Sequence, residues 1–362
     1  MINIAKPIIG QEEINAVISV MESGAIASGT KVTEFENNFA KYLGSKHAVA
    51  TSSGTTALEV ALKAAGIKKG DKIITTPFSF IASTNAIVYS GAIPVFADID
   101  ERTFNICPDS IEKILEYKSN IRALLIVHLY GQSCNMDRIM KIVKRHNLIL
   151  IEDCAQAHGA EWSDQKVGTF GDVAAFSFYP TKNMTTAEGG MIVTNNQEMA
   201  KSARLLINHG MEIRYYHDSI GYNYRMTNIA AAIGVEQVKK LDFFNQIRQR
   251  NAEFYDKNIS NDAIALPYCD MNGKHVYHQY TLRIKQGRRE QFIKTLDENE
   301  IGYGVYYPLS IPEQKCYDSY GFSKNHTITD RIKNEVLSIP IHPSLTEDEI
   351  EKIIKVMNSF GG

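Results

Sequence analysis

The stretch IRALLIVHLYGQSCNMDRIMKIVKRHNLILIEDC, residues 121–154, contains two apolar runs separated by a helical pattern. Apolar residues are nearly continuous at the start of the stretch and again in residues 148–151, which is typical of strands buried on both faces. Between them, residues 136–147 have the apolar spacing of an amphipathic helix. A strand, a helix and a second strand in this order predict a βαβ unit with parallel strands.

The same alternation extends on both sides, over residues 45 to 195. The predicted strands include HAVATS (47–52), DKIITT (71–76) and IPVFADID (93–100), and the stretch TTALEVALKAAG (55–66) is a predicted helix that ends at Gly66. Repeated βα units with apolar strands predict an α/β fold with a mostly parallel, doubly wound central sheet flanked by helices.

The C-terminal third has a different pattern. Residues 234–259 read as a long, charged amphipathic helix. One strand candidate (278–284) and two helical patterns (288–300 and 347–360) follow. We therefore expect a large domain over residues 1–240 and a smaller α+β domain over residues 241–362, with the N-terminal segment able to pack on the small domain.

Charge and cysteine content exclude several classes of protein. The formal net charge of the 362 residues is -2, which gives no general reason to bind nucleic acid or an anionic membrane. The five cysteines are odd in number and include no CxxC pair, so neither a disulfide framework nor a metal site is expected. No apolar run approaches the roughly 18 residues of a membrane span. We expect reduced thiols and a cytoplasmic location.

Two reactive side chains follow strands of the predicted sheet. Asp153 lies at the end of an apolar strand, and alternation points Glu152 to the opposite side. Lys182 lies in SFYPTKNMTTAEGG (177–190), a turn-rich loop after another strand. Ligands of open parallel sheets bind outside the carboxyl ends of the strands, so both side chains can face one crevice.

A lysine and a carboxylate in one crevice suit pyridoxal phosphate, whose aldehyde forms an imine with a lysine amine. Asp153 could keep the pyridine nitrogen protonated, the turn at Gly54 before a helix could hold the phosphate, and Phe80 could stack on the ring. Each feature alone has a plainer explanation. Lys182 could be a surface charge, Asp153 a loop or cap residue, the Gly54 turn a helix cap and Phe80 a core residue.

Ordered motifs over most of residues 30–240 make the combination more specific. They are SSGTTAL, GDKIITTPFSFIAS, GAIPVFADID, VHLYGQ, IEDCAQAHGA, VGTFGDVAAFSFYPTKNMTTAEGGMIVTN and GYNYRMTNIAAAIGVEQ. With them the chain resembles the DegT/StrS-type sugar aminotransferases. These are pyridoxal phosphate enzymes of the aspartate aminotransferase fold type, which is fold type I.

The resemblance implies a role for each matching residue. Lys182 corresponds to the catalytic lysine that forms the internal aldimine, and Asp153 to the carboxylate paired with the pyridine nitrogen. The other cofactor contacts implied are Gln156 at the ring hydroxyl, Phe80 as the stacking aromatic, and Gly54, Thr55 and Ser177 at the phosphate. Asn223 corresponds to a phosphate contact from the neighbouring subunit, which implies a homodimer with shared active sites.

The implied reaction moves an amino group, from glutamate in most of the family, to a nucleotide-linked keto-sugar. Related dehydratases have histidine where this chain has Lys182, so transamination is favoured over dehydration. Many relatives have His-Tyr-Pro where this chain has Tyr306-Tyr307-Pro308. This difference leaves the substrate open, together with the nucleotide, the ring carbon and the pathway.

A non-catalytic, cofactor-binding regulator of the same fold remains an alternative. A nicotinamide dehydrogenase is disfavoured because no GxGxxG follows a strand. His158 and His209 are interpreted as structural or substrate-contact residues, since lysine already moves the proton. Residues 214–217 either help to recognise the nucleotide-sugar or form a mobile surface loop.

Overall fold

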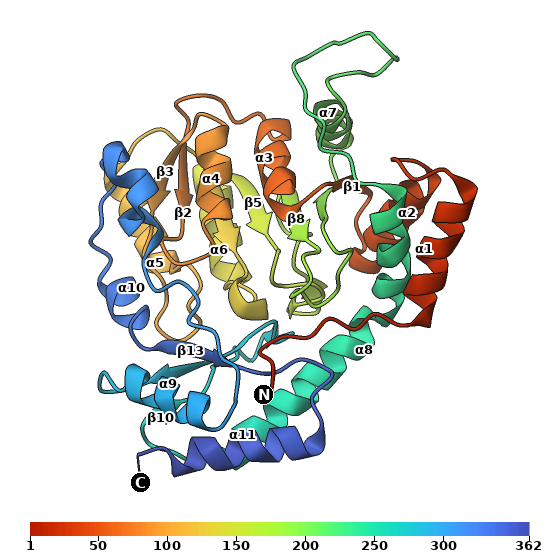
Figure 1. Cartoon of the computed structure of the whole chain (residues 1–362). Helices are drawn as coiled ribbons and strands as arrows, with labels where there is room; N and C mark the ends of the chain where they lie inside the picture. Colours follow the sequence, from red (N-terminus) through yellow and green to blue (C-terminus); the bar gives the residue numbers. More distant parts are fainter. Residues whose placement is uncertain (362) are drawn as a thin grey trace.

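A seven-stranded sheet forms the centre of the computed structural model, which describes residues 1–361 (Figure 1). Its strand order is β1-β9-β8-β5-β4-β2-β3. The strands are β1 (His47–Thr51), β2 (Lys72–Thr75), β3 (Ile93–Phe96), β4 (Ile121–Val127), β5 (Ile149–Asp153), β8 (Val173–Ser177) and β9 (Gly190–Thr194). The predicted α/β class is confirmed, and β4, α6 (Met136–His146) and β5 form the βαβ unit expected from residues 121–154.

All neighbouring strands from β3 to β8 are parallel, and β9 pairs antiparallel with both β8 and β1. The reversal follows from the connection between β8 and β9. Residues 178–189 form no helix, and a parallel neighbour needs a crossover that is usually helical. The sheet is therefore mostly parallel, as predicted, and the loop that reverses the chain is the one that carries Lys182.

Side chains that alternate along the strands enter different hydrophobic cores. Leu125 of β4 packs in a core with α3 (Gly54–Ala64) and α4 (Ala82–Tyr89), whereas Leu124 packs on the other face with residues of α5 (Pro108–Tyr117) and α6. Both side chains are fully buried. Burial on both faces explains why these strands are continuously apolar.

The 31-residue helix α8 (Asn228–Asn258) connects the sheet to the C-terminal part of the chain. It contacts α2 (Thr30–Leu43) near its start and α11 (Glu347–Ser359) near its end (Figure 1). The predicted boundary near residue 240 falls inside this helix. The C-terminal part has its own hydrophobic core, around a sheet of order β10-β12-β13. Ile2 belongs to this core, and its backbone exchanges hydrogen bonds with Glu300 and Gly302.

The other elements complete the layers. The helices are α1 (Gln11–Ser23), α7 (Gln197–Ile207), α9 (Arg289–Glu298), α10 (Thr327–Ile332) and three 3-10 helices, η1 (Leu129–Gly131), η2 (Ile311–Glu313) and η3 (Lys315–Tyr320). The strands are β6 (Glu161–Trp162), β7 (Gln165–Lys166), β10 (Ile264–Ala265), β11 (Gly273–Lys274), β12 (Tyr280–Ile284) and β13 (Val336–Ile339). Within residues 1–361, none of the helices has the length and apolar character needed to cross a bilayer.

Candidate active site

A cavity of about 420 Å³ opens at the carboxyl ends of β4, β5 and β8, whose last residues all line it. Seven of the eight predicted site residues line this cavity: Gly54, Thr55, Phe80, Asp153, Gln156, Ser177 and Lys182. Asn223 does not. It is exposed and forms a β-bridge with Asn208 at the base of a loop that projects beyond α7 (Figure 1).

Asp153 is a buried carboxylate with few hydrogen bonds. Its Oδ2 accepts a 2.7 Å hydrogen bond from the hydroxyl of Ser83, and its Oδ1 accepts one of 3.1 Å from the backbone of Ala155. Burial raises the pKa of Asp153, and the Ser83 bond, the Ala155 bond and the Lys182 charge partly oppose that rise. A buried carboxylate in this state is stabilised by a cationic ligand such as a pyridinium N–H.

Lys182 faces the same cavity. Burial lowers the pKa of its amine from 10.5 to about 8, against the opposing effect of the Asp153 carboxylate. None of the described side chains hydrogen-bonds to the amine or pairs with it directly. A large fraction of Lys182 is therefore neutral near pH 8, which is the state that attacks an aldehyde or accepts a proton.

A polar turn at the start of α3 lines the cavity. Ser53 caps the helix by accepting a hydrogen bond from Thr56, so the plainer cap interpretation of SGTTAL is also correct. Gly54 packs tightly on Ser177, because a Cβ at Gly54 would lie 2.5 Å from the Cβ of Ser177. Free backbone N–H groups at a helix start, beside small hydroxyl residues, fit a phosphate group.

The side of the cavity is aromatic. Phe80 is 59% exposed although it lines a cavity, so its interpretation as a core residue is wrong. Gln156 accepts a hydrogen bond from the backbone of Tyr130 and donates one of 2.8 Å to the hydroxyl of Tyr307. The two tyrosine rings stack at 6.3 Å with an interplanar angle of 14°.

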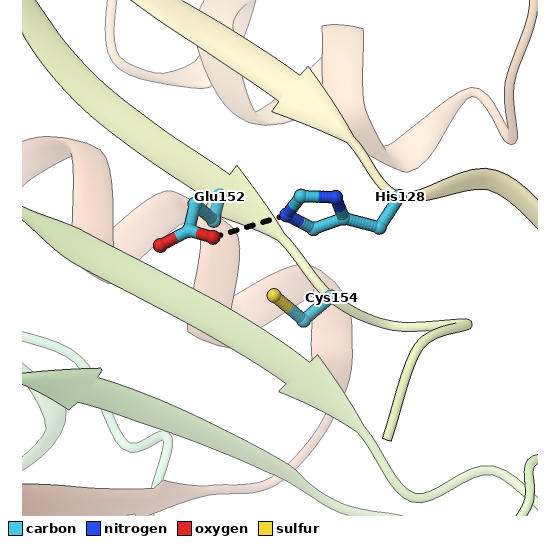
Figure 2. A group of neighbouring side chains, drawn as sticks. All are labelled: His128, Glu152 and Cys154. Atoms are coloured by element: carbon cyan, nitrogen blue, oxygen red, sulfur yellow. Dashed lines mark hydrogen bonds and ion pairs between the residues drawn. The ribbon is translucent and has the colours of Figure 1, made fainter. Parts of the chain in front are cut away.

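A buried histidine, glutamate and cysteine, His128, Glu152 and Cys154, form a separate group beside β5 (Figure 2). His128 Nδ1 accepts from the backbone N–H of Cys134, so its proton is on Nε2, which lies 3.0 Å from Glu152. Glu152 also accepts hydrogen bonds from Gly168, Phe170 and Gly171. Its four lone-pair positions are thus used within the protein, and burial keeps the thiol of Cys154 protonated by raising its pKa.

The Glu152 group is therefore a structural anchor for the loop of residues 168–171, and not a favourable metal site. It also supports the prediction that Glu152 points away from Asp153, because the two carboxylates bind partners on opposite sides of β5. His158 is fully buried, with a pKa lowered to about 3 by burial and by Lys182, and neither it nor His209 lines the cavity.

Several residues of the cavity were missed by the sequence analysis. They are Ser83, Tyr130, Tyr179, Glu188, His278 and Gln279. Only Gln279 and His278 follow a visible signal, the polar start of the predicted strand at residues 278–284. Tyr306, singled out for its difference from relatives, lines the cavity as well.

Comparisons with known proteins give matches over nearly the whole chain. A sequence model of the DegT/DnrJ/EryC1/StrS aminotransferase family matches residues 7–358. GDP-perosamine synthase of Caulobacter vibrioides is 39% identical, over 99% of this chain and 97% of its own length. The dTDP-3-amino-3,6-dideoxy-alpha-D-galactopyranose transaminase of Aneurinibacillus thermoaerophilus is 38% identical over 97% and 96%. The crystal structure of S. venezuelae DesV, in complex with a ketimine intermediate, superposes with a TM-score of 0.92 at 33% identity, covering 96% of this chain and 93% of DesV.

Proposed function

This chain belongs to the DegT/DnrJ/EryC1/StrS aminotransferase family, whose enzymes use pyridoxal phosphate, and on this premise we propose that it aminates a keto-sugar carried on a nucleotide. The amino donor is an amino acid, and glutamate is our expectation. The observation that carries the proposal is the pairing of Lys182, with its lowered pKa, and buried Asp153 in one cavity.

The residues of the cavity fit the cofactor. Pyridoxal phosphate supplies an aldehyde for a lysine amine and a pyridinium ring that withdraws electrons from the bound amino acid. Lys182 would hold the aldehyde carbon, and Asp153 would accept a hydrogen bond from the ring nitrogen. Gly54, Thr55 and Ser177 would hold the phosphate, Gln156 would contact the ring hydroxyl, and Phe80 would cover a ring face.

Lys182 also moves the proton in this proposal. Its Nζ, when not bonded to the cofactor, is an amine whose pKa burial lowers to about 8. Such a group can take the proton from the α-carbon of the donor and deliver it again nearby, because its pKa is close to the working pH. The hydrogen bond from Ser83 favours the charged form of Asp153 against the effect of burial, and this carboxylate would keep the ring nitrogen protonated.

The substrate assignment rests on the relatives. The names of GDP-perosamine synthase and of the dTDP-linked sugar transaminase refer to sugars on GDP and dTDP. A sugar on a nucleotide would enter beside Tyr306, where this chain differs from many relatives. Asn223 would reach the cofactor phosphate of a second copy, which makes the working unit a homodimer with shared sites. We expect this unit to act in the cytoplasm. The division into a large and a small domain near residue 240 stays a prediction.

The test compares the protein with Lys182→Ala. Purified with pyridoxal phosphate, the protein should show a visible absorption band that bleaches when glutamate is added, and the band should return when a nucleotide-linked keto-sugar follows. Lys182→Ala should lose this response, whereas Lys274→Ala, at an exposed ion pair with Glu161, should keep it. A band that no amino acid changes would favour the regulator, and wild-type turnover by Lys182→Ala would contradict the proposed role.

A further inference from the structure

Arg248 is a buried cation without a buried anion to balance it. This residue of α8 is 5% exposed, and its guanidinium donates from Nη1 to the backbone oxygens of Tyr277 (3.1 Å) and His278 (3.4 Å). Its Nε has no partner among the described residues, and no described carboxylate forms an ion pair with it. Burial lowers its pKa only to about 10, so it stays charged at neutral pH. A buried charge left in this way is costly and favours an anion nearby.

His278 lies between Arg248 and the cavity. It is 5% exposed, its backbone oxygen accepts from Arg248, and it lines the cavity together with Lys182. Its Nδ1 is buried and has no partner within residues 1–361. Burial and the charges of Lys182 and Arg248 lower the pKa of this imidazole well below 6.5, so it is neutral and can donate one N–H.

The backbone around His278 is held firmly in this position. Val276 N–H donates to the oxygen of Gly131, and Gln279 N–H donates to the oxygen of Tyr130. Between them, Tyr277 has a φ of 42°, in the left-handed region that a residue with a side chain adopts at a cost. The fold thus accepts strain at Tyr277 while presenting an imidazole with unused hydrogen-bonding capacity to the cavity.

The charged side chains that line the cavity leave the carboxylate of an amino-acid donor without a group to bind it. Lys182 is the one cationic side chain in the described lining, and the lining includes the carboxylates of Asp153 and Glu188. An amino-acid donor brings at least one further carboxylate. Lys182 cannot bind it permanently, because its amine is needed for the cofactor and the proton.

We propose that His278 donates a hydrogen bond to a carboxylate of the amino-acid donor, and that Arg248, directly behind it, supplies the positive potential that stabilises this anion. The inference rests on the proposed function, since it assumes an amino-acid donor. His278 touches the ligand in this arrangement, and Arg248 acts through His278 as a positioning and electrostatic residue. A neutral imidazole beside two cations is a stronger donor than an isolated one, because losing its proton is easier near positive charge.

Other buried imidazoles do not offer the same contact. His275 faces a different, small pocket, and its Nδ1 accepts from the backbone of Tyr277. His158 is surrounded by Phe176 and Phe178 and does not line the cavity. His326 is buried to a similar degree, with an unpartnered Nδ1, but lies outside the cavity in a groove beside β3. It is therefore a matched control.

The experiment uses the cofactor-loaded protein and two ligands. Glutarate, a dicarboxylate without an amino group, reports binding alone by calorimetry. Glutamate, added without any keto-sugar, reports the first half-reaction by the loss of cofactor absorbance. His278→Leu should weaken glutarate binding about tenfold and raise the half-saturating glutamate concentration by a similar factor, as expected for one hydrogen bond to a charged group. His278→Gln, which retains an N–H donor, should recover most of the loss, and His326→Leu should match the unchanged protein.

Arg248→Gln should weaken the binding of both glutarate and glutamate, as His278→Leu does, while cofactor binding persists. Unchanged glutarate and glutamate binding in folded His278→Leu protein would overturn the inference, and so would His278→Gln protein that binds both ligands as weakly as His278→Leu. A lower maximal rate at unchanged half-saturation would overturn it as well. These outcomes require that the unchanged protein responds to glutamate. If the protein without substitutions holds the cofactor but binds neither glutarate nor glutamate, the proposed donor is contradicted, and so is the proposed function on which the inference rests.

Discussion

The hydroxyl of Ser83, in α4, donates a 2.7 Å hydrogen bond to the buried carboxylate of Asp153, which is 70 positions further along the chain at the end of β5. Burial raises the pKa of Asp153, and this bond lowers it. A serine that the sequence did not single out therefore helps to keep the proposed partner of the pyridine nitrogen ionised.

Replacing Ser83 should weaken cofactor binding. In Ser83→Ala, Asp153 loses its strongest stabilising contact, its pKa rises further, and the dissociation constant for pyridoxal phosphate should increase about tenfold. Equilibrium titration followed by cofactor absorbance measures this change. Ser90→Ala, just after the end of α4, removes a hydroxyl that donates only to the backbone oxygen of Ala86, and should leave the constant unchanged. Equal constants for both variants would contradict the role of Ser83.

Cofactor uptake should follow the titration of Lys182. The pKa of its amine is lowered to about 8, so the protonated form dominates below pH 8 and the reactive neutral form above it. The uptake rate of cofactor-free protein should rise through a midpoint near pH 8 and then level off. Asp153 opposes the shift, so Asp153→Asn should move the midpoint to lower pH. Stopped-flow absorbance gives both profiles, and a rate that still climbs towards pH 10.5 would mean that the amine is solvated.

Removing the charge of Glu152 should destabilise the fold. Its carboxylate accepts three backbone N–H groups and the His128 proton, whereas the amide nitrogen of Glu152→Gln would point a donor at other donors. We expect a loss of about 2–4 kcal/mol in the free energy of unfolding, measured with urea. Glu161→Gln, at a partly exposed pair with Lys274, should cost less than about 1 kcal/mol. A chelator that lowered the stability as much as Glu152→Gln would indicate a metal site instead.

A side chain at Gly54 should disturb the proposed phosphate site. The Cβ of Gly54→Ala would lie 2.5 Å from the Cβ of Ser177, so the turn must move away from the end of β8. We expect folded protein whose affinity for pyridoxal phosphate falls by about tenfold or more. Gly273→Ala, where the nearest atom is 3.4 Å away, is the control. Unaltered affinity in Gly54→Ala would place the phosphate elsewhere.

Much of the fold could be predicted because its signals are local. Residues 123–127 and 148–151 are continuously apolar because both faces of these strands are buried, which favours apolar side chains. The antiparallel direction of β9 was not predicted. The loop that contains Lys182 is shorter than a helical crossover and contains no helix, but it does not differ from one in hydrophobicity. The site was predictable where residues end a strand or begin a helix, as Asp153 and Gly54 do. Ser83 and Tyr130 reach the cavity through contacts between distant segments, which leave no periodic pattern in the sequence.

Helix α8 has a consequence for how the protein could be taken apart. Its 31 residues span about 46 Å without interruption. One end lies in the core with α2, and the other lies in the core with α11. No flexible linker therefore exists at residue 240, and a chain divided there would cut a continuous helix and separate Leu241 from the core that it shares with α2. We expect the parts of the chain on either side of residue 240 to be retained together in evolution, to be expressed together and to unfold as one unit.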